Sequence, residues 1–423
     1  MLDKNTCERY TALLQEELVP ALGCTEPIAI AFAAARAREV LGCMPQRLVV
    51  QCSGNIIKNV KGVIVPTTGN MKGIDTSAIL GALAGDSEKK LEVLSGVTSE
   101  DIEKTKQLVA EKICQVELIR DVSNLYIIVR AIAGEHEALV EVQDSHTHIT
   151  RIEKDHEVLY EDKPASAHTN SASGPEMDLE SIFQFALQGD LTDLIPVLDR
   201  QIQCNTRIAE EGMKGTYGCG VGASIKENYG DSVRTMARAM PAAGSDARMG
   251  GCVLPVVINS GSGNQGMTVS LPVITYAKEL GVSQETLYRA LVLSNLTAIY
   301  IKSGIGKLSA FCGAVGAGCA AGAAITWLRG GDYDAVCRTI INTLANTSGI
   351  VCDGAKASCA AKIASAVDAA LFAGDLALAG KAFGDGEGLV AEDADATVRN
   401  IMRLGRDGMK ETDIEILHMM IGQ

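Results

Sequence analysis

The chain has 423 residues, enough for one large domain or two lobes and too many for a mini-protein. Hydrophobic residues make up 47% and charged residues 21%, a composition too apolar for a disordered chain. Its 38 Lys and Arg against 52 Asp and Glu give a net charge of −14, and no local basic patch offsets it. Such a charge repels phosphates and anionic lipids, so we expect neither a nucleic acid nor a membrane as a partner.

Small residues and cysteines set the next constraints. Aromatic residues make up only 4% whereas there are 43 glycines, so we expect helices that pack through the close approach of small side chains. The first residues lack the basic and apolar regions of a signal peptide, which indicates the cytoplasm and reduced thiols. In a reducing compartment, the 13 cysteines are more typical of metal ligands or catalytic groups than of disulfides.

The first part of the chain, residues 1–165, predicts an α/β lobe. Residues 7–40 have a helical period that is interrupted from Pro20 to Pro27, and Pro27 suits the first turn of the second helix of this pair. From residue 47, β-branched residues alternate with period two, which predicts a small mixed sheet with a helix over 99–114. The predicted strands are RLVVQCSG, NVKGVIVP, NLYIIVRAIAG, HEALVEVQ and THITRIEK. His146 and His148, at alternating positions near the last strand, are expected at the surface.

The second part, residues 178–423, is predicted to be mostly helical, so the fold class is α+β. Residues 161–177 are rich in Ser, Ala and Pro without an apolar period, which indicates a linker or exposed loop between the two parts. Beyond them, the helical period recurs in LESIFQFALQ, LTDLIPVLDRQIQCNTRIAEEG, SVRTMARAM and SQETLYRALVLSNLTAIYIK.

One uncharged stretch, residues 308–328, is long enough to span a bilayer and contains a Gly318-x-x-x-Gly322 spacing. It consists mostly of Ala, Gly and Cys with few Leu or Ile, and no comparable segment occurs elsewhere in the chain. We therefore predict a buried small-residue helix at the centre of the second part rather than a membrane span.

The segment GSGNQG, residues 261–266, matches the dinucleotide fingerprint G-x-G-x-x-G. Pro255 falls inside the strand that this fingerprint would need, and Pro272 falls inside its helix. We favour a different interpretation, in which a glycine-rich loop leads into a helix N-terminus and holds a small carboxylate. The side chains that would do so are Ser262, Asn264 and Gln265.

The segment GIGKL ends like a phosphate-binding loop, but Leu308 stands where that loop needs Ser or Thr. We reject a nucleotide site here and keep Lys307 as a further candidate contact for the carboxylate.

Three cysteines of the second part are the candidate metal ligands. Cys312 begins the small-residue helix, and Cys352 and Cys359 lie in GIVCDGAKASC, the former in a Gly-flanked turn and the latter near a helix start. The two later thiols can point towards a centre that the helix of Cys312 reaches from another side. Spacing alone also allows all three to be buried packing residues, because free cysteine is among the most buried residue types.

The segments KSGIGKLSAFCGAVGAGCAAGAAITWLRGG and GIVCDGAKASC resemble the α-chain of iron–sulfur L-serine dehydratases, and more closely the related L-cysteine desulfidases. The motif LGCTEP, which contains Cys24, also resembles the desulfidase group, and the resemblance covers most of the chain. It implies a 4Fe-4S cluster with three cysteine ligands and one open iron, which we expect to be lost easily in air. The implied ligands are Cys312, Cys352 and Cys359.

The resemblance implies a β-elimination that converts L-cysteine into sulfide, ammonia and pyruvate, because an open iron is a Lewis acid that can bind the leaving group. The C-terminal segment ETDIEILHMMIGQ lacks the cysteine found there in serine dehydratases, and their second pair of cysteines is more widely spaced, which favours the desulfidase.

Cys24 is the candidate base or acceptor thiol of this reaction. It precedes a helix start, where the helix dipole and free N–H groups are expected to lower the pKa of its thiol. Glu26 either assists it or only stabilises the first helical turn, and a packing role for Cys24 also stays open.

Several alternatives remain at this stage. A pyridoxal-phosphate eliminase would use Ser262-Gly263-Asn264 as its substrate loop and Lys226 as an imperfect Schiff-base position. A serine dehydratase or a non-enzymatic iron–sulfur redox or iron sensor would also bind a cluster. The sequence leaves open the substrate among cysteine, serine and other β-substituted amino acids, the roles of Cys219 and Cys319, and the assembly, for which a homodimer is one option.

Overall fold

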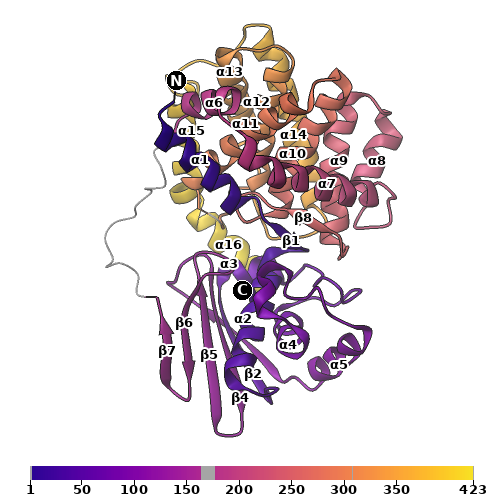
Figure 1. Ribbon diagram of the computed structural model, residues 1–423, viewed down its shortest axis with the longest axis vertical. Helices are drawn as coiled ribbons and strands as arrows, with labels where there is room; N and C mark the ends of the chain where they lie inside the picture. Colours follow the sequence, from indigo (N-terminus) through magenta and orange to yellow (C-terminus); the bar gives the residue numbers. More distant parts are fainter. Residues whose placement is uncertain (1, 163–176, 307, 423) are drawn as a thin grey trace.

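The computed structural model describes residues 2–162, 177–306 and 308–422, and it confirms the predicted α+β fold. A six-stranded sheet with its helices forms one half, and a helical bundle forms the other (Figure 1). The first half contains α2 (Thr25–Leu41), β2 (Arg47–Ser53), α3 (Gly54–Val60), α4 (Ile74–Ala84), η1 (Ser87–Glu92), α5 (Ser99–Ala110), β3 (Cys114–Ile119), β4 (Tyr126–Ala133), β5 (His136–Gln143), β6 (Ile149–Lys154) and β7 (Glu157–Glu161).

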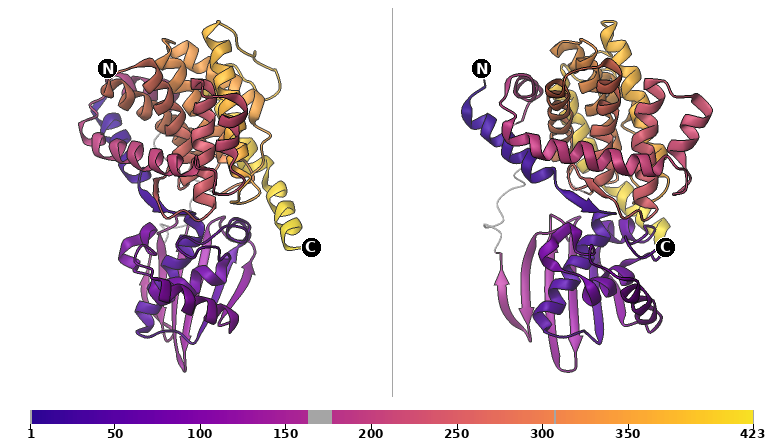
Figure 2. Two further views of the ribbon diagram at one scale, coloured as in Figure 1. Left: turned by 90° about the vertical axis from the view of Figure 1, so that its right-hand side faces the viewer. Right: turned by 45° about the vertical axis from the view of Figure 1, so that its right-hand side comes forward.

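The helical half collects elements from both ends of the chain. It contains α1 (Lys4–Glu17), β1 (Pro20–Leu22), α6 (Leu179–Gln188), η2 (Thr192–Leu194), α7 (Ile195–Gly212), α8 (Val221–Tyr229), α9 (Val233–Met249), β8 (Pro255–Val257), α10 (Gly263–Leu280), α11 (Gln284–Ser303), α12 (Gly313–Leu328), α13 (Tyr333–Thr347), α14 (Cys359–Leu378) and α15 (Ala394–Arg403). The π-turn η3 (Leu404–Gly408) and α16 (Lys410–Ile421) then lead back to the sheet half (Figure 2).

The sheet has the strand order β3-β2-β4-β5-β6-β7, with β2 and β3 parallel and all other neighbours antiparallel. Side chains of β4 alternate between buried and half-buried, as expected for a sheet with one face on a core. Four of the five predicted strands are present as β2, β4, β5 and β6.

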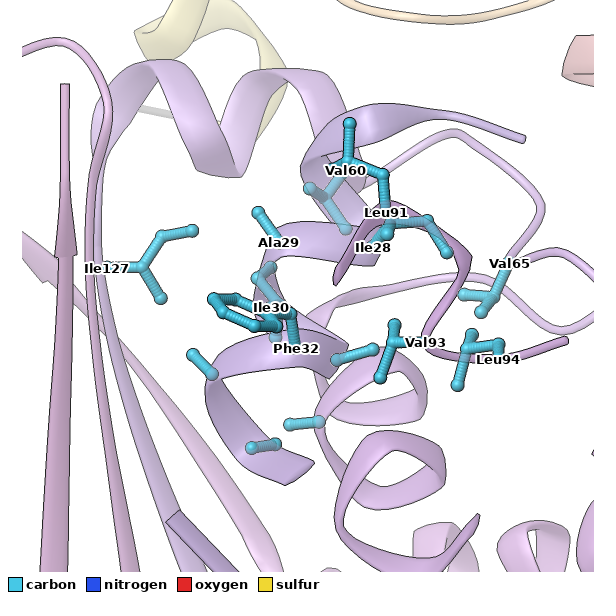
Figure 3. Packing of buried hydrophobic residues seen from close by; sticks show 14 of the residues in the cluster. Ile28, Ala29, Ile30, Phe32, Val60, Val65, Leu91, Val93, Leu94 and Ile127 are labelled. Atoms are coloured by element: carbon cyan, nitrogen blue, oxygen red, sulfur yellow. The ribbon is translucent and has the colours of Figure 1, made fainter. Parts of the chain in front are cut away.

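Helix α2 is the centre of the sheet half. Figure 3 shows Ile30 and Phe32 of this helix between Ile127 of the sheet and Val93 on the opposite side. The small side chains of α2 allow α4 to approach closely. The approach is so close that a Cβ on Gly81 of α4 would lie 2.3 Å from the carbonyl oxygen of Ala31. The first turn of α2 is buried, as is Cys24, which is the N-cap of this helix.

The predicted strand NVKGVIVP does not form. The Ser53 hydroxyl accepts a hydrogen bond from the Ile56 N–H at 3.5 Å and caps α3, so the chain is helical up to Val60. The valines that suggested a strand, Val63 and Val65, are buried in irregular chain instead.

The helix predicted over 99–114 ends at Ala110 as α5. Lys112 has a φ of 57°, which ends the helix, and Cys114 then begins β3, a strand that the sequence did not indicate.

Helix α12 confirms the predicted buried small-residue helix. It contacts α10, α11, α13 and α14, and nearly all its residues are buried. A Cβ on Gly318 would lie 3.0 Å from the carbonyl carbon of Ala366, and one on Gly322 would lie 2.8 Å from the Cβ of Ala370. No helix within the described ranges combines the length and the apolar character needed to cross a membrane.

The first and last helices of the chain link the two halves. Helix α1 packs on the helical half, where the Tyr10 hydroxyl lies 2.7 Å from the Ser181 hydroxyl and its ring lies 5.5 Å from that of Phe185. Helix α16 returns to contact α3. The predicted linker lies almost entirely outside the described residues, and the division into 1–165 and 178–423 stays a prediction, with α1 placed beside the second unit.

The contact between α12 and α14 leads to a stability prediction. Replacing Gly322→Val forces side-chain atoms into the backbone of α14, so we expect the free energy of unfolding to fall by about 2 kcal/mol. Gly349→Ala is the control, because Gly349 is exposed with open space around its Cα. Equal stability of the two variants in denaturant unfolding would contradict this account of the packing.

Candidate active site

The segment that carries Cys24 is fixed to the helical half by a short antiparallel pair. Strand β1 pairs with β8, with Ala21 opposite Val256. The Arg248 Nε donates to the Gly23 carbonyl at 2.8 Å, and the Thr25 hydroxyl donates to the Gly261 carbonyl at 3.0 Å. These bonds bring the CTEP motif against the GSGNQG loop.

The GSGNQG loop begins α10, as predicted. Ser262 is its N-cap and accepts from the Gln265 N–H at 3.5 Å, while the Asn264 Oδ1 accepts from the Arg248 Nη1 at 3.2 Å. A Cβ on Gly266 would lie 2.0 Å from the Val257 carbonyl oxygen. Gly266 therefore has no room for a side chain, because its backbone packs against β8, and this glycine is explained without a dinucleotide.

Two backbone contacts bring Cys312 and Cys352 together. Phe311 and Val351 form an isolated antiparallel bridge. On either side of it, the Cys312 N–H donates to Ile350 at 3.2 Å and the Cys352 N–H donates to Ala310 at 2.6 Å.

The third cysteine arrives through helix packing. Gly318 contacts Ala366 and Gly322 contacts Ala370, so α12 and α14 run parallel in a fixed register. The same register holds at the N-termini of the two helices. It brings Cys312, the N-cap of α12, beside Cys359, the first residue of α14.

All predicted site residues that the structure describes line one pocket. They are Cys24, Glu26, Ser262, Asn264, Gln265, Cys312, Cys352 and Cys359. Lys307 lies outside the described residues. Cys319 is buried within α12 and contacts the Ile340 carbonyl, and Cys219 is exposed, so neither lines the pocket.

The sequence analysis missed two cations of this pocket, Arg248 and Lys302. Arg248 is 2% exposed and lies on the part of α9 that continues beyond Pro241, where the predicted helix had stopped. Lys302 lies in the last turn of α11, and burial holds its pKa below the ordinary value. A charged residue at the end of an apolar helical stretch was the available signal for Lys302.

Cys24 and Glu26 form a buried pair. The Cys24 Sγ donates to the Glu26 Oε2 at 3.0 Å. The Thr25 hydroxyl, which donates to the Gly261 carbonyl, also lies 3.1 Å from Oε2, and the Asn59 Nδ2 donates to Oε1 at 3.3 Å. The Cys24 thiol and the Asn59 amide, which come from two segments, therefore orient this carboxylate.

The expected lowering of the Cys24 pKa is wrong. Burial raises the pKa of this thiol well above its ordinary value, and the charge of Glu26 raises it further, while Arg248 only partly compensates. The helix N-terminus does not overcome a carboxylate at hydrogen-bond distance. Cys24 is therefore a protonated thiol at neutral pH.

Glu26 is the ionised member of the pair. Burial raises its pKa, but His146, the Cys24 thiol and Arg248 together outweigh burial and hold the pKa below the ordinary value. The prediction of a surface position for His146 is wrong, because this side chain is buried, whereas His148 is exposed and pairs with Asp162.

The three thiols that line the pocket are soft ligands of the kind that bind transition metals. In the part of the chain that the structure describes, no three His, Cys, Asp or Glu converge as ligands of one metal ion. An iron–sulfur cluster instead takes each thiolate at a different iron. Burial and the neighbouring Cys352 raise the pKa of Cys312 to about 12, and burial also raises the pKa of Cys359. Buried cysteine thiols of this kind lose their protons when they bind a metal, and they then act as thiolate ligands.

Comparison with known proteins defines the class. The family model described as serine dehydratase alpha chain matches residues 88–418. The chain belongs to the serine dehydratase alpha chain family, and this membership indicates a lyase. The resemblance inferred from the sequence is thus confirmed at the level of the family.

Relatives match over nearly their whole length. A UPF0597 protein of Lachnoclostridium phytofermentans is 55% identical over 97% of this chain and 98% of its own. A UPF0597 protein of Desulfitobacterium hafniense is 48% identical over 98% of this chain and 97% of its own. A third, from Treponema denticola, is 45% identical over 99% of both chains.

The Cys24–Glu26 pair predicts a change in thiol reactivity. In a Glu26→Gln variant the negative charge that raises the Cys24 pKa is gone, so the pH midpoint of Cys24 alkylation should fall. Mass spectrometry of the Cys24 peptide across a pH series measures this midpoint. Cys43, which is exposed, is the internal control and should keep its profile. An unchanged or higher midpoint for Cys24 would contradict the electrostatic coupling.

Proposed function

We propose that this protein is a carbon–sulfur lyase that converts L-cysteine into sulfide, ammonia and pyruvate by β-elimination with a 4Fe-4S cluster. This proposal rests mainly on one pocket, which is lined by three thiols, a thiol–carboxylate pair and a buried arginine. The chain that forms this pocket belongs to the serine dehydratase alpha chain family. Each group has a separate task in this reaction.

Cys312, Cys352 and Cys359 would hold the cluster. When bound, a cluster with three thiolate ligands supplies a Lewis-acidic iron for the sulfur that leaves the substrate. The chain favours a negatively charged cluster here, because the Lys302 and Lys362 ammonium groups lie close enough to interact with these thiols.

Arg248 and the GSGNQG loop would bind the substrate carboxylate. Arg248 donates with Nε and Nη1 to Gly23 and Asn264, so its guanidinium is held rigidly at the pocket wall. Ser262, Asn264 and Gln265 add polar groups at the start of α10, whose positive dipole end favours an anion. Orientation by the carboxylate would place the Cα–H bond of the substrate towards Cys24 and its Cβ–S bond towards the three cysteines.

Cys24 and Glu26 would move the proton. As the Cα–H bond breaks, the proton passes to the Cys24 Sγ while the thiol's own proton passes to the Glu26 Oε2, the acceptor 3.0 Å away. The electron pair forms the Cα–Cβ double bond and the Cβ–S bond breaks, releasing sulfide. The aminoacrylate product then tautomerises to an imine, and water hydrolyses it to pyruvate and ammonia. The steps balance without an oxidant or reductant.

The pyridoxal-phosphate alternative receives no support. Lys226, its Schiff-base candidate, is exposed on α8 and does not line the pocket that contains the GSGNQG loop. A serine dehydratase activity is the second candidate, because the family model carries that name. The motif LGCTEP, which contains Cys24 and resembles the desulfidase group, is the observation that favours cysteine over serine.

The decisive assay is anaerobic reconstitution with iron and sulfide, followed by measurement of sulfide and pyruvate release from L-cysteine beside pyruvate release from L-serine. We expect stoichiometric sulfide and pyruvate from L-cysteine. Replacing Cys312, Cys352 or Cys359 by Ala should lower turnover at least about 100-fold and reduce the iron content. Cys319→Ala, on the same helix as Cys312 but outside the pocket, should keep both.

Other outcomes of this assay would overturn the proposal. Pyruvate from L-serine but not from L-cysteine would indicate a dehydratase. Bound iron without turnover of either amino acid would indicate a sensor or redox protein. Full turnover in the three cysteine variants would remove the cluster from the reaction.

Arg248 yields a separate prediction about substrate binding. An Arg248→Lys variant loses the planar fork that fits a carboxylate, so KM for L-cysteine should rise roughly 10- to 100-fold. Arg234→Lys is the matched control on the same helix, because Arg234 pairs with Asp368 and Asp375 away from the pocket. Steady-state kinetics measure both variants, and an unchanged KM in Arg248→Lys would exclude this assignment.

A further inference from the structure

A buried lysine of the sheet half contacts the turn that carries two of the pocket cysteines. Lys58 on α3 is 1% exposed, and its Nζ donates to the Cys352 carbonyl at 3.2 Å. The same ammonium forms an ion pair with Asp413 of α16, whose side chain is 12% exposed. Three separate segments therefore meet at one buried charge.

The backbones at this contact are also close. Gly354 follows Cys352 by two residues and has a φ of 96°, and a Cβ on it would lie 2.4 Å from the Lys58 carbonyl oxygen. The cysteine turn therefore lies directly against α3, without an intervening layer of side chains. On its other side, the Cys352 N–H is held by Ala310.

We propose that Lys58, paired with Asp413, is a positioning residue that fixes the Cys352 turn for cluster binding and couples it to the docking of the C-terminal helix. This inference rests on the proposed function, because it takes Cys352 as a ligand. A buried ammonium cannot be left without acceptors, so Lys58 holds the Cys352 carbonyl and the Asp413 carboxylate in place at the same time. The N–H bond to Ala310 and the carbonyl bond to Lys58 then restrain both sides of the residue that carries the thiol.

The chain offers a matched control for this contact. Lys61, one turn further along, donates to the Met420 carbonyl and also joins the end of α3 to α16. This hydrogen bond does not involve the cysteine turn. A loss of α16 docking alone would therefore appear in both lysine variants, whereas a loss of turn positioning would appear only when Lys58 is changed.

The first test uses the metal-free full chain and hydrogen–deuterium exchange. In Lys58→Met, we expect amides of the peptide 351–358 to exchange about tenfold faster than in the wild type. In Lys61→Met, only amides of α16 should change. Because Lys58→Met leaves Asp413 without its partner, the paired variant Lys58→Met/Asp413→Leu is measured as well and should show the same faster exchange in 351–358 with a retained fold.

The second test uses the reconstituted chain and the rate of iron loss to a chelator, followed by visible absorbance. Both variants that lack Lys58 should lose iron about tenfold faster than the wild type, and Lys61→Met should not. Unchanged exchange of 351–358 in the variants without Lys58, or an equal increase in Lys61→Met, would overturn the proposal. If wild-type protein holds iron but releases no sulfide from L-cysteine, the proposed substrate fails while the positioning role is still decided by exchange and iron loss.

Discussion

The close parallel packing of α12 on α14 is the constraint on which the pocket depends. Gly318 and Gly322 allow the two helices to approach until backbone and Cβ atoms are in contact with Ala366 and Ala370. Such contact fixes the register as well as the distance, because any shift would bring Cβ atoms into collision. The N-termini of both helices therefore end at the same level, and Cys312 and Cys359 meet there. The chain is rich in glycine and poor in aromatic residues, a composition that allows helices to approach this closely.

The second feature is the contrast between two kinds of thiol in one pocket. Three thiols are gathered where lysines can balance a negative charge, whereas Cys24 lies beside a carboxylate that keeps it protonated. In the proposed function, the first arrangement would hold the cluster and the second would transfer the proton. Since Cys24 comes from the helix packed on the sheet and the other thiols come from the bundle, the pocket needs both halves of the chain.

The sequence predicts the pocket better than it predicts the local electrostatics. The family resemblance selected Cys312, Cys352 and Cys359 as a set, because their spacing alone also allowed buried packing residues. The GSGNQG loop was selected by its glycines and polar side chains. Arg248 was missed because α9 continues through Pro241, which a local rule takes as a helix end, while packing against neighbouring helices keeps it helical. The pKa of Cys24 was predicted in the wrong direction because a dipole argument considers one helix end and not the burial and the carboxylate that the tertiary fold adds.

The predicted boundaries of helices and strands were wrong where a single side chain determines where the element begins or ends. The cap by Ser53 converted the start of a predicted strand into α3, and that helix is the one that brings Lys58 to the cysteine turn. The packing of α1 on the helical half and of α16 on the sheet half likewise depends on contacts between residues far apart in the chain. No local sequence pattern reveals such contacts.

Mössbauer spectroscopy of the anaerobically reconstituted chain distinguishes iron sites by their ligands, so it can show whether one iron is open to the substrate. The account predicts one iron distinct from the three that are held by Cys312, Cys352 and Cys359, and a change in the spectrum of that iron alone when L-cysteine is added. A spectrum in which all irons are equivalent, or one that L-cysteine leaves unchanged, would contradict an open site for the amino acid.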